Sequence, residues 1–189
     1  MSASRIYTKL GDDGSTGRLF GGRVSKTDPL VQTLGSIDEA ISALGVARAQ
    51  CADATLAATV LRIQRDLFVV AADLSANPQA RDRLVPGVSL VTAAMTAHVE
   101  SLIDALVASR PLRPVFVVPG ANVASAALDL ARSVVRRAER DVVACRAGAG
   151  DREPSNPHAA SYLNRVSDLL YVLARQAAGD EDEPPSHVD

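Results

Sequence analysis

Hydrophobic residues recur every three or four positions over five long stretches of the chain, which is the spacing of helices that bury one face. The first stretch follows Thr27-Asp28-Pro29, where an aspartate N-cap and a proline at the first helical position predict a helix start. Four further stretches have the same spacing, at about residues 55–77, 89–108, 122–146 and 156–178. The pattern predicts an all-α protein, a five-helix bundle.

The segments outside these stretches have a different composition. Residues 78–87 form a connection rich in charged residues and turn formers, and residues 111–119 contain too much proline for a helix. We expect the second segment to be extended and to carry an exposed or pocket-lining Phe116. We predict one domain over residues 1–189, with an N-terminal loop at 1–26, a helical bundle at 27–178 and a disordered acidic tail at 179–189.

Composition narrows the class of protein. Of the 189 residues, 47% are hydrophobic and 3% aromatic, which is typical of a bundle with small, closely packed side chains. A net charge of −2 argues against nucleic acid as the main partner. The sequence has no signal-peptide pattern and no apolar run near the ~20 residues of a membrane span. With two isolated cysteines, it predicts a cytoplasmic protein that binds neither nucleic acid nor membranes.

Residues 131–140 read ARSVVRRAER and concentrate positive charge on one predicted helix. Arg132, Arg136 and Glu139 share a stripe beside an apolar face. Like charges four residues apart destabilise a helix by roughly 0.2–0.5 kcal/mol per pair, so an anionic partner is expected. Acids on neighbouring helices or a polyphosphate ligand fit equally well, because arginine binds carboxylate and phosphate in the same forked geometry. A solvated helix face is the alternative.

The N-terminal loop is rich in glycine, with glycines at positions 11, 14, 17, 21 and 22. Glycines let backbone amides approach phosphate oxygens, and charge and hydroxyls come from Lys9, Ser15, Thr16 and Lys26. The loop is not a Walker A motif, since Arg23-Val24 stands where Lys-Ser/Thr is required. Phosphate binding is favoured over a flexible tail.

Polar residues on the first and fifth helices are further candidates. Asp38 is expected to face the interior and to need an arginine partner, whereas Glu39 is expected to face solvent. Asn164, Ser167 and Asp168 share one face of the fifth helix, where an internal hydrogen-bond network and a ligand pocket both remain open. The three histidines are scattered and do not predict a metal site.

Seven motifs stand in a fixed order: Thr8-Lys9-x-Gly11-Asp12-x-Gly14-x-Thr16, Arg23-Val24-Ser25-Lys26, Gly35-x-x-Asp38-Glu39, Ile63-Gln64-x-x-Leu67-Phe68, Phe116-x-x-Pro119-Gly120, Ala131-Arg132-x-x-x-Arg136-Arg137-Ala138-Glu139-Arg140 and Leu163-Asn164-Arg165-x-Ser167-Asp168. This ordered set resembles the ATP:cob(I)alamin adenosyltransferases of the trimeric five-helix kind, over nearly the whole chain. No single motif decides the resemblance, which rests on their order.

The resemblance implies a homotrimer that binds ATP and a reduced corrinoid together at its subunit interfaces. Cobalt(I) of cob(I)alamin attacks the 5′ carbon of ATP, which yields adenosylcobalamin and triphosphate. Mg²⁺ would be carried mainly by the ATP phosphates, with no protein ligand assigned. A cobalamin reductase and an adenosylcobalamin-dependent mutase are the implied partners.

The resemblance also assigns roles by position. The phosphate-binding residues would be Thr8, Lys9, Gly11, Gly14, Ser15, Thr16 and Lys26, and the helix residues on ATP would be Arg136, Glu139 and Asn164. Arg132 would pair with Asp38 across a subunit boundary and hold the corrinoid pocket, and Phe116 would close on the lower corrin face. Arg136, Arg132, Asp38 and Phe116 are therefore the residues expected to carry catalysis.

The first helix departs from the family pattern. Ala40-Ile41-Ser42 stands where the family commonly has Leu-Asn-Ser, and the usual Arg, Glu and Tyr are replaced by Leu30, Gln32 and Leu34. Two other functions remain open on the residues alone. One is a nucleotide-dependent phosphotransferase or hydrolase, and the other is a non-catalytic helical assembly protein whose arginines make only salt bridges between subunits.

Overall fold

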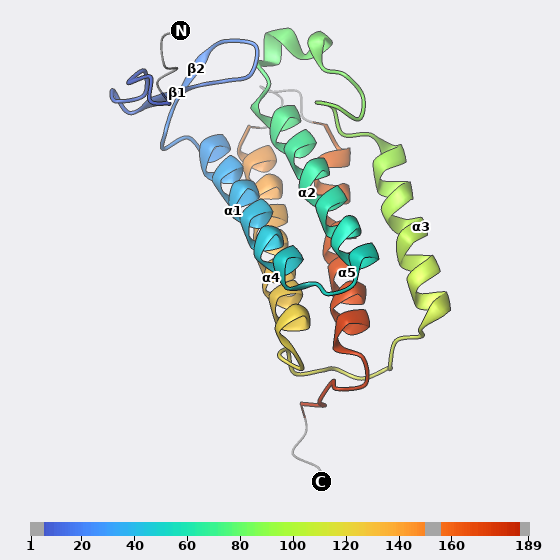
Figure 1. Cartoon of the computed structure of the whole chain (residues 1–189). Helices are drawn as coiled ribbons and strands as arrows, with labels where there is room; N and C mark the ends of the chain where they lie inside the picture. Colours follow the sequence, from blue (N-terminus) through green and yellow to red (C-terminus); the bar gives the residue numbers. More distant parts are fainter. Residues whose placement is uncertain (1–5, 150–155, 186–189) are drawn as a thin grey trace, which may run out of the picture.

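Five long helices make up most of the chain in the computed structural model, which describes residues 6–149 and 156–185. They are α1 (Pro29–Gln50), α2 (Ala54–Ser75), α3 (Ala93–Ser109), α4 (Val123–Ala149) and α5 (His158–Ala178). Helix α4 packs against α1 and α5, α2 packs against α1, and α3 lies outermost against α5 (Figure 1). The predicted five-helix, all-α bundle is confirmed.

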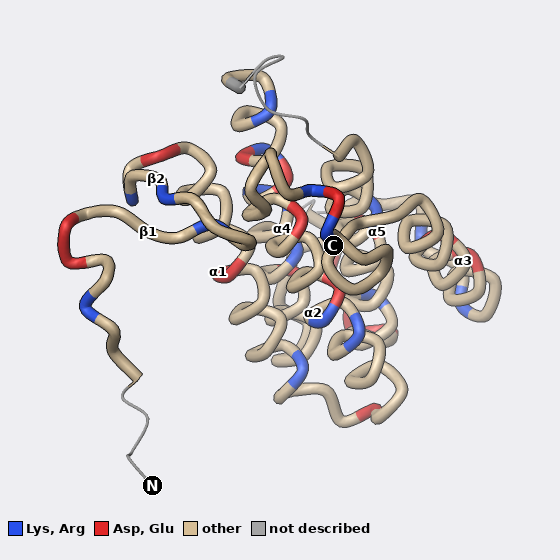
Figure 2. Tube along the Cα trace, turned by 90° about the horizontal axis from the view of Figure 1, so that it is seen from above, with Lys and Arg blue, Asp and Glu red and all other residues tan. Residues whose placement is uncertain are grey.

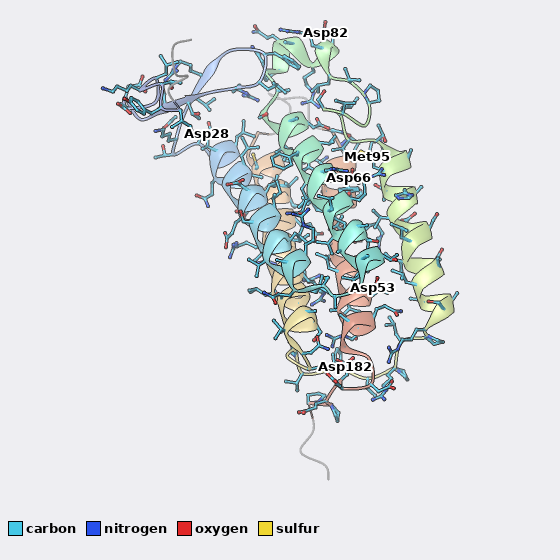
Figure 3. The ribbon with its side chains drawn as sticks, viewed as in Figure 1. Asp28, Asp53, Asp66, Asp82, Met95 and Asp182 are labelled. Carbon is cyan, nitrogen blue, oxygen red and sulfur yellow. The ribbon has the colours of Figure 1, made fainter. Side chains whose placement is uncertain are left out.

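Aspartate side chains cap the N-termini of the first two helices. Asp28 accepts a hydrogen bond from the Leu30 amide at 2.8 Å, as its place before Pro29 predicted. Asp53 does the same for the Thr55 amide at 2.7 Å (both aspartates are labelled in Figure 3). Each cap satisfies a backbone donor that a helix start otherwise leaves without a partner, and so fixes where the helix begins.

Glycine allows a close approach between α1 and α2. Gln64 of α2 donates from Nε2 to the Ile41 carbonyl at 2.9 Å. A Cβ atom at Gly45 would lie 3.3 Å from that nitrogen, which is tighter than an ordinary contact. Gly45 therefore keeps the space that the glutamine needs to link the two helices.

A buried carboxylate joins three segments at the end of the bundle where α2 ends. Asp73 is 1% exposed, accepts hydrogen bonds from the Val91 amide at 2.9 Å and from Asn156 Nδ2 at 2.6 Å, and pairs with Arg81. Val91 precedes α3, Asn156 precedes α5, and Arg81 lies in the short 3₁₀ helix η1 (Pro78–Arg83). Asp73 thus fixes how α3 and α5 enter the bundle.

A second buried carboxylate links the middle of the bundle. Tyr162 of α5 donates its hydroxyl proton to Asp66 of α2 at 2.9 Å, and Arg62 approaches the same carboxylate at 3.1 Å (Asp66 is labelled in Figure 3). Burial raises the pKa of the Tyr162 phenol, and the negative charge of Asp66 raises it further. The phenol therefore stays a neutral donor at physiological pH.

The N-terminal loop contains a small hairpin that the sequence did not predict. Strands β1 (Ser15–Gly17) and β2 (Arg23–Ser25) pair antiparallel, with Thr16 opposite Val24. The hairpin projects away from the bundle beyond the start of α1 (Figure 2). Leu19 fastens it to the end of α2 by donating to the Ser75 carbonyl at 3.0 Å.

Part of the C-terminal segment is docked on the bundle. The carbonyl of Glu183 accepts a hydrogen bond from the Val118 amide at 2.8 Å, and Asp182 pairs with Arg175 at 3.0 Å. Within the tail that was expected to be disordered, residues 179–185 are thus described in contact with the bundle, through the buried Arg175 and the Val118 amide. Residues 186–189 lie outside the described residues. No helix in the described part of the chain is long and apolar enough to cross a membrane.

We predict that Asp73→Ala lowers the free energy of unfolding by about 3 kcal/mol, because it leaves buried donors and Arg81 without their acceptor. Asp82→Ala is the matched control, since Asp82 is exposed in the same connection (Figure 3), and it should change stability by less than about 0.5 kcal/mol. Urea unfolding followed by circular dichroism measures both. Equal stability of the two variants would contradict the role given to Asp73.

Candidate active site

The arginines of α4 differ in how far they are exposed to solvent. Arg137 forms an ion pair with Glu39 of α1, which is exposed as expected. Arg132 is half-buried, whereas Arg136 and Arg140 are exposed. The acid on a neighbouring helix thus pairs with Arg137, not with the arginines for which an anionic partner was expected, and Arg136 is left available to a ligand.

A pocket of about 350 Å³ with both polar and apolar lining lies against the C-terminal half of α4, and we name it the Arg136 pocket. Its polar side chains are those of Arg136, Glu139, Arg140 and Asn164. Asn164 of α5 donates from Nδ2 to Glu139 Oε1 at 3.0 Å, which orients the carboxylate. Three charged groups and an amide at one opening are suited to a polar, anionic ligand.

A larger pocket of about 650 Å³ begins one helical turn earlier on α4, and we name it the Phe116 pocket. Its wall is mostly apolar, and the polar residues that line it are Arg113, Asp129, Arg132, Asp168 and Tyr171. The Phe116 ring is 86% exposed at its mouth, so the segment is both exposed and pocket-lining. An exposed aromatic ring beside an apolar hollow of this size is suited to a large planar ligand.

The polar face of α5 has features of both alternatives that the sequence left open, an internal hydrogen-bond network and a ligand pocket. Asn164 belongs to the Arg136 pocket and Asp168 to the Phe116 pocket. Ser167, which lies between them, is fully buried and donates to the Asn164 carbonyl at 2.8 Å. The face therefore combines an internal hydrogen bond with two pocket-lining residues.

Asp38 does not face the interior, contrary to the prediction. Helix α1 buries Ile37 and Ile41 instead, so a helical step of one residue carries Asp38 out to the surface. Asp38 shares an exposed stripe with Gly35 and Val46, and nothing lies within 4 Å of where a Cβ at Gly35 would stand. Among the described residues, Asp38 has no ion-pair partner, and Arg132 does not reach it.

The phosphate-loop candidates lie in the hairpin or in the residues that directly flank it. A Cβ at Gly11 would stand 3.1 Å from both Lys26 Nζ and the Ser15 carbonyl, so glycine makes room for the lysine. The Lys26 amide donates to the Gly14 carbonyl at 2.9 Å. Gly14 has a φ of 81°, a left-handed conformation that glycine adopts without strain.

An ion pair and a hydrogen bond from Arg23 link the two sides of the hairpin. Arg23 Nε donates to the Ser15 hydroxyl at 2.9 Å, and the Arg23 guanidinium pairs with Asp13 at 3.2 Å. Hydrogen bonds from the Ser15 side chain and amide hold the pKa of Asp13 below its usual range. The Ser15 hydroxyl is thus engaged within the loop, whereas Thr8 and Lys9 are exposed.

The two groups of candidate residues are not brought together within one chain. The loop and the C-terminal half of α4 lie at the same end of the bundle, since Ser36 near the start of α1 donates to Asp141 at 2.6 Å. The loop nevertheless leans toward α2, where Leu19 and Asn77 hold it. Within the described ranges, no hydrogen bond or ion pair joins the loop to Arg136, Glu139 or Asn164.

A protein-borne metal site is not evident. Across residues 6–149 and 156–185, no group of three or more His, Cys, Asp or Glu residues lies close enough to hold a metal ion. That Mg²⁺ is carried by ATP phosphates stays a prediction.

Sequence reasoning missed a buried charge cluster beside the Phe116 pocket. Arg175 of α5 is 7% exposed and pairs with Asp129 of α4 and with Asp182. Burial raises the pKa of Asp129, and the neighbouring Arg175 and Arg132 oppose that rise. The available signal was an arginine inside the apolar run of the fifth helix, since a buried arginine needs acidic partners.

The fold is a helical bundle with two neighbouring pockets, one lined by arginines and one mostly apolar. The family model described as cobalamin adenosyltransferase matches residues 6–177. The chain is 42% identical to a corrinoid adenosyltransferase of Mycobacterium tuberculosis over 182 residues, 95% of this chain and 91% of the relative. It is 38% identical to one of Citrobacter freundii over 172 residues, 90% of this chain and 93% of the relative.

Solved structures agree with these relatives. A variant PduO-type ATP:corrinoid adenosyltransferase from Lactobacillus reuteri, complexed with cobalamin and ATP, superposes with a TM-score of 0.80 at 29% identity. The match covers 92% of this chain and 91% of that chain. The chain belongs to the cobalamin adenosyltransferase family, which confirms the resemblance seen in its motifs.

Proposed function

We propose that the chain transfers the 5′-deoxyadenosyl group of ATP to the cobalt of cob(I)alamin, at sites shared between three copies of the chain. The observation that carries the proposal is the pair of neighbouring pockets on α4 and α5. The Arg136 pocket has the charges that a nucleotide needs, and the Phe116 pocket has the apolar volume that a corrin ring needs. Arg132 and Arg136 stand one turn apart, about 6 Å along the helix, so the two ligands would meet.

The chemistry explains why the protein supplies no nucleophile. Cobalt(I) of the corrinoid substrate donates an electron pair to the 5′ carbon of ATP. A cobalt–carbon bond forms, the carbon–oxygen bond breaks, and its electron pair leaves with triphosphate. The protein has to hold the two substrates in line and stabilise the charge on the departing triphosphate.

ATP would be held from two sides. The loop residues Thr8, Lys9, Gly11, Gly14, Ser15, Thr16 and Lys26 would surround the phosphates, which carry Mg²⁺. Arg136 would bind ATP from the helix side, with Glu139 and Asn164 already oriented by their hydrogen bond. The loop is pre-folded by Arg23, so less order has to be gained on binding.

The corrinoid would be held by Phe116 and by an ion pair between subunits. Asp38 is exposed and Arg132 does not contact it within the chain, so the pair that the resemblance implies requires a second copy. Neighbouring copies would cover the stripe of Gly35, Asp38 and Val46. Phe116 would lie on the lower corrin face and exclude the dimethylbenzimidazole tail, which favours four-coordinate, more easily reduced cobalt.

The reaction implies one partner enzyme that supplies its substrate and another that consumes its product. Cobalt(I) has to be made by a cobalamin reductase, and adenosylcobalamin would be consumed by a dependent mutase. Cys51 and Cys145 form no disulfide, which fits a reducing, cytoplasmic setting.

Anaerobic turnover tests the reaction itself. With ATP, Mg²⁺ and chemically reduced cobalamin, we expect the cob(I)alamin spectrum to convert to that of adenosylcobalamin with equimolar release of triphosphate. Release of phosphate or pyrophosphate, with cob(I)alamin unchanged, would point to a phosphotransferase or hydrolase instead.

Co-expression of two inactive variants tests the shared site. Lys9→Ala disables the loop and Arg136→Ala disables the helix side, so each homotrimer should show severely reduced turnover while remaining folded. In a random mixture, about a quarter of the interfaces combine an intact loop with an intact helix, so activity should return to that fraction. Co-expression of Lys9→Ala with the double variant should restore none. A site contained in one chain would leave both mixtures inactive.

Replacing Asp38 tests whether this residue contributes to corrinoid binding and not to ATP binding. Asp38→Asn should weaken corrinoid binding roughly thirtyfold, equivalent to about 2 kcal/mol, because Arg132 loses its charged partner. ATP binding should be unchanged. Glu39→Gln is the matched control, since Glu39 pairs with Arg137 at the surface and should affect neither ligand. Separate titrations of ATP and cob(II)alamin measure this, and equal loss of both would rule out the assigned role.

A further inference from the structure

Residues 180–183 cross the end of the bundle where α5 ends, and we name them the C-terminal strap. Gly179 has a φ of 67°, which lets the chain turn back at the end of α5. Asp180 then pairs with Arg110 at 2.7 Å, and Asn122 donates to Glu181 at 3.4 Å. The strap thereby contacts the residues that bracket the segment carrying Phe116.

The strap also holds that segment directly. The Glu183 carbonyl accepts a hydrogen bond from the Val118 amide at 2.8 Å, in an antiparallel bridge. Val118 lies two residues after Phe116, in a stretch without helix or ladder hydrogen bonds to fix it. A main-chain hydrogen bond at this point limits how far the Phe116 ring can move from the pocket mouth.

Asp182 connects the strap to the interior of the pocket. Its carboxylate pairs at 3.0 Å with Arg175, which is buried and also pairs with Asp129 (Asp182 is labelled in Figure 3). Asp129 lines the Phe116 pocket. The guanidinium of Arg175 therefore lies between a carboxylate of the pocket wall and a carboxylate of the strap.

Tyr171 lies between Arg175 and Arg132 and contacts both guanidinium groups. The guanidinium carbons of Arg175 and Arg132 each lie 5.5 Å from the centre of the Tyr171 ring. Cation–π contacts of this kind fix the position of a ring and of the cations beside it. Displacing Asp182 leaves Arg175 held by Asp129 alone among these two carboxylates, so that Arg175, Tyr171 and then Arg132 are less well placed.

We propose that the strap is a positioning element for the corrinoid site, with Asp182 and Arg175 as its positioning residues. It holds Phe116 through Val118 and Arg132 through Tyr171, so its loss weakens corrinoid use and spares ATP. The Arg136 pocket contains none of these residues. The assignment of corrinoid to the Phe116 pocket rests on the proposed function.

Two neighbouring acids provide the test. Asp182→Asn removes the charge that pairs with Arg175, whereas Glu183→Gln removes an exposed charge and keeps the carbonyl that accepts from Val118. We expect Asp182→Asn to raise KM for cob(I)alamin by about two- to thirtyfold with KM for ATP unchanged, and Glu183→Gln to match the parent enzyme. Identical behaviour of the two variants, or equal increases in both KM values, would overturn the proposal.

Hydrogen exchange keeps the test valid where a variant is less stable or turnover is absent. In the ligand-free protein, Asp182→Asn and a chain ending at Gly179 should lose protection at the Val118 amide while α1 and α2 keep theirs. A uniform increase over all helices would overturn the positioning role. Failure of the parent enzyme to adenosylate cob(I)alamin would refute the proposed function, while the exchange pattern still decides whether the strap holds the Phe116 segment.

Discussion

The structure depends on the two-sided packing of α4. The helix buries Leu128, Ala131, Val135, Ala138 and Val142 completely, and it packs against α1 on one side and α5 on the other. Burial of that apolar stripe leaves only the remaining surface for the arginines. Their direction is thus set by the hydrophobic face behind them, and both pockets open along the boundary between α4 and α5.

Periodicity and capping residues predicted most of the fold because these signals are local. Asp28 and Pro29 mark a helix start in the sequence as they do in the structure. The hairpin was not predictable from alternation, since each strand has only three residues. Docking of the tail was missed because Asp182 becomes ordered only through Arg175, whose burial is a tertiary property.

In the candidate site, too, residues with a local sequence signal were predicted and those that depend on tertiary contacts were not. Arg136, Glu139 and Asn164 were found from motif order, and the structure brings them into one pocket. Asp38 was misplaced because an apolar neighbourhood in sequence does not say which side of a helix meets another helix and which remains outside. The helix residues also lie apart from the phosphate-loop candidates, and a single sequence carries no direct signal for a site completed by another copy.

Asp73 has a consequence for the order of folding. Its partners Val91 and Asn156 lie 18 and 83 residues further along the chain, so the contact with Asn156 closes a long loop. Helices α1 and α2 contact each other through residues close in sequence, a kind of contact that generally forms quickly, whereas a partial bundle without α5 would leave the Asp73 carboxylate short of one donor in a desolvated position. Intermediates that lack α5 are therefore penalised, and the five helices are coupled into one cooperative folding unit.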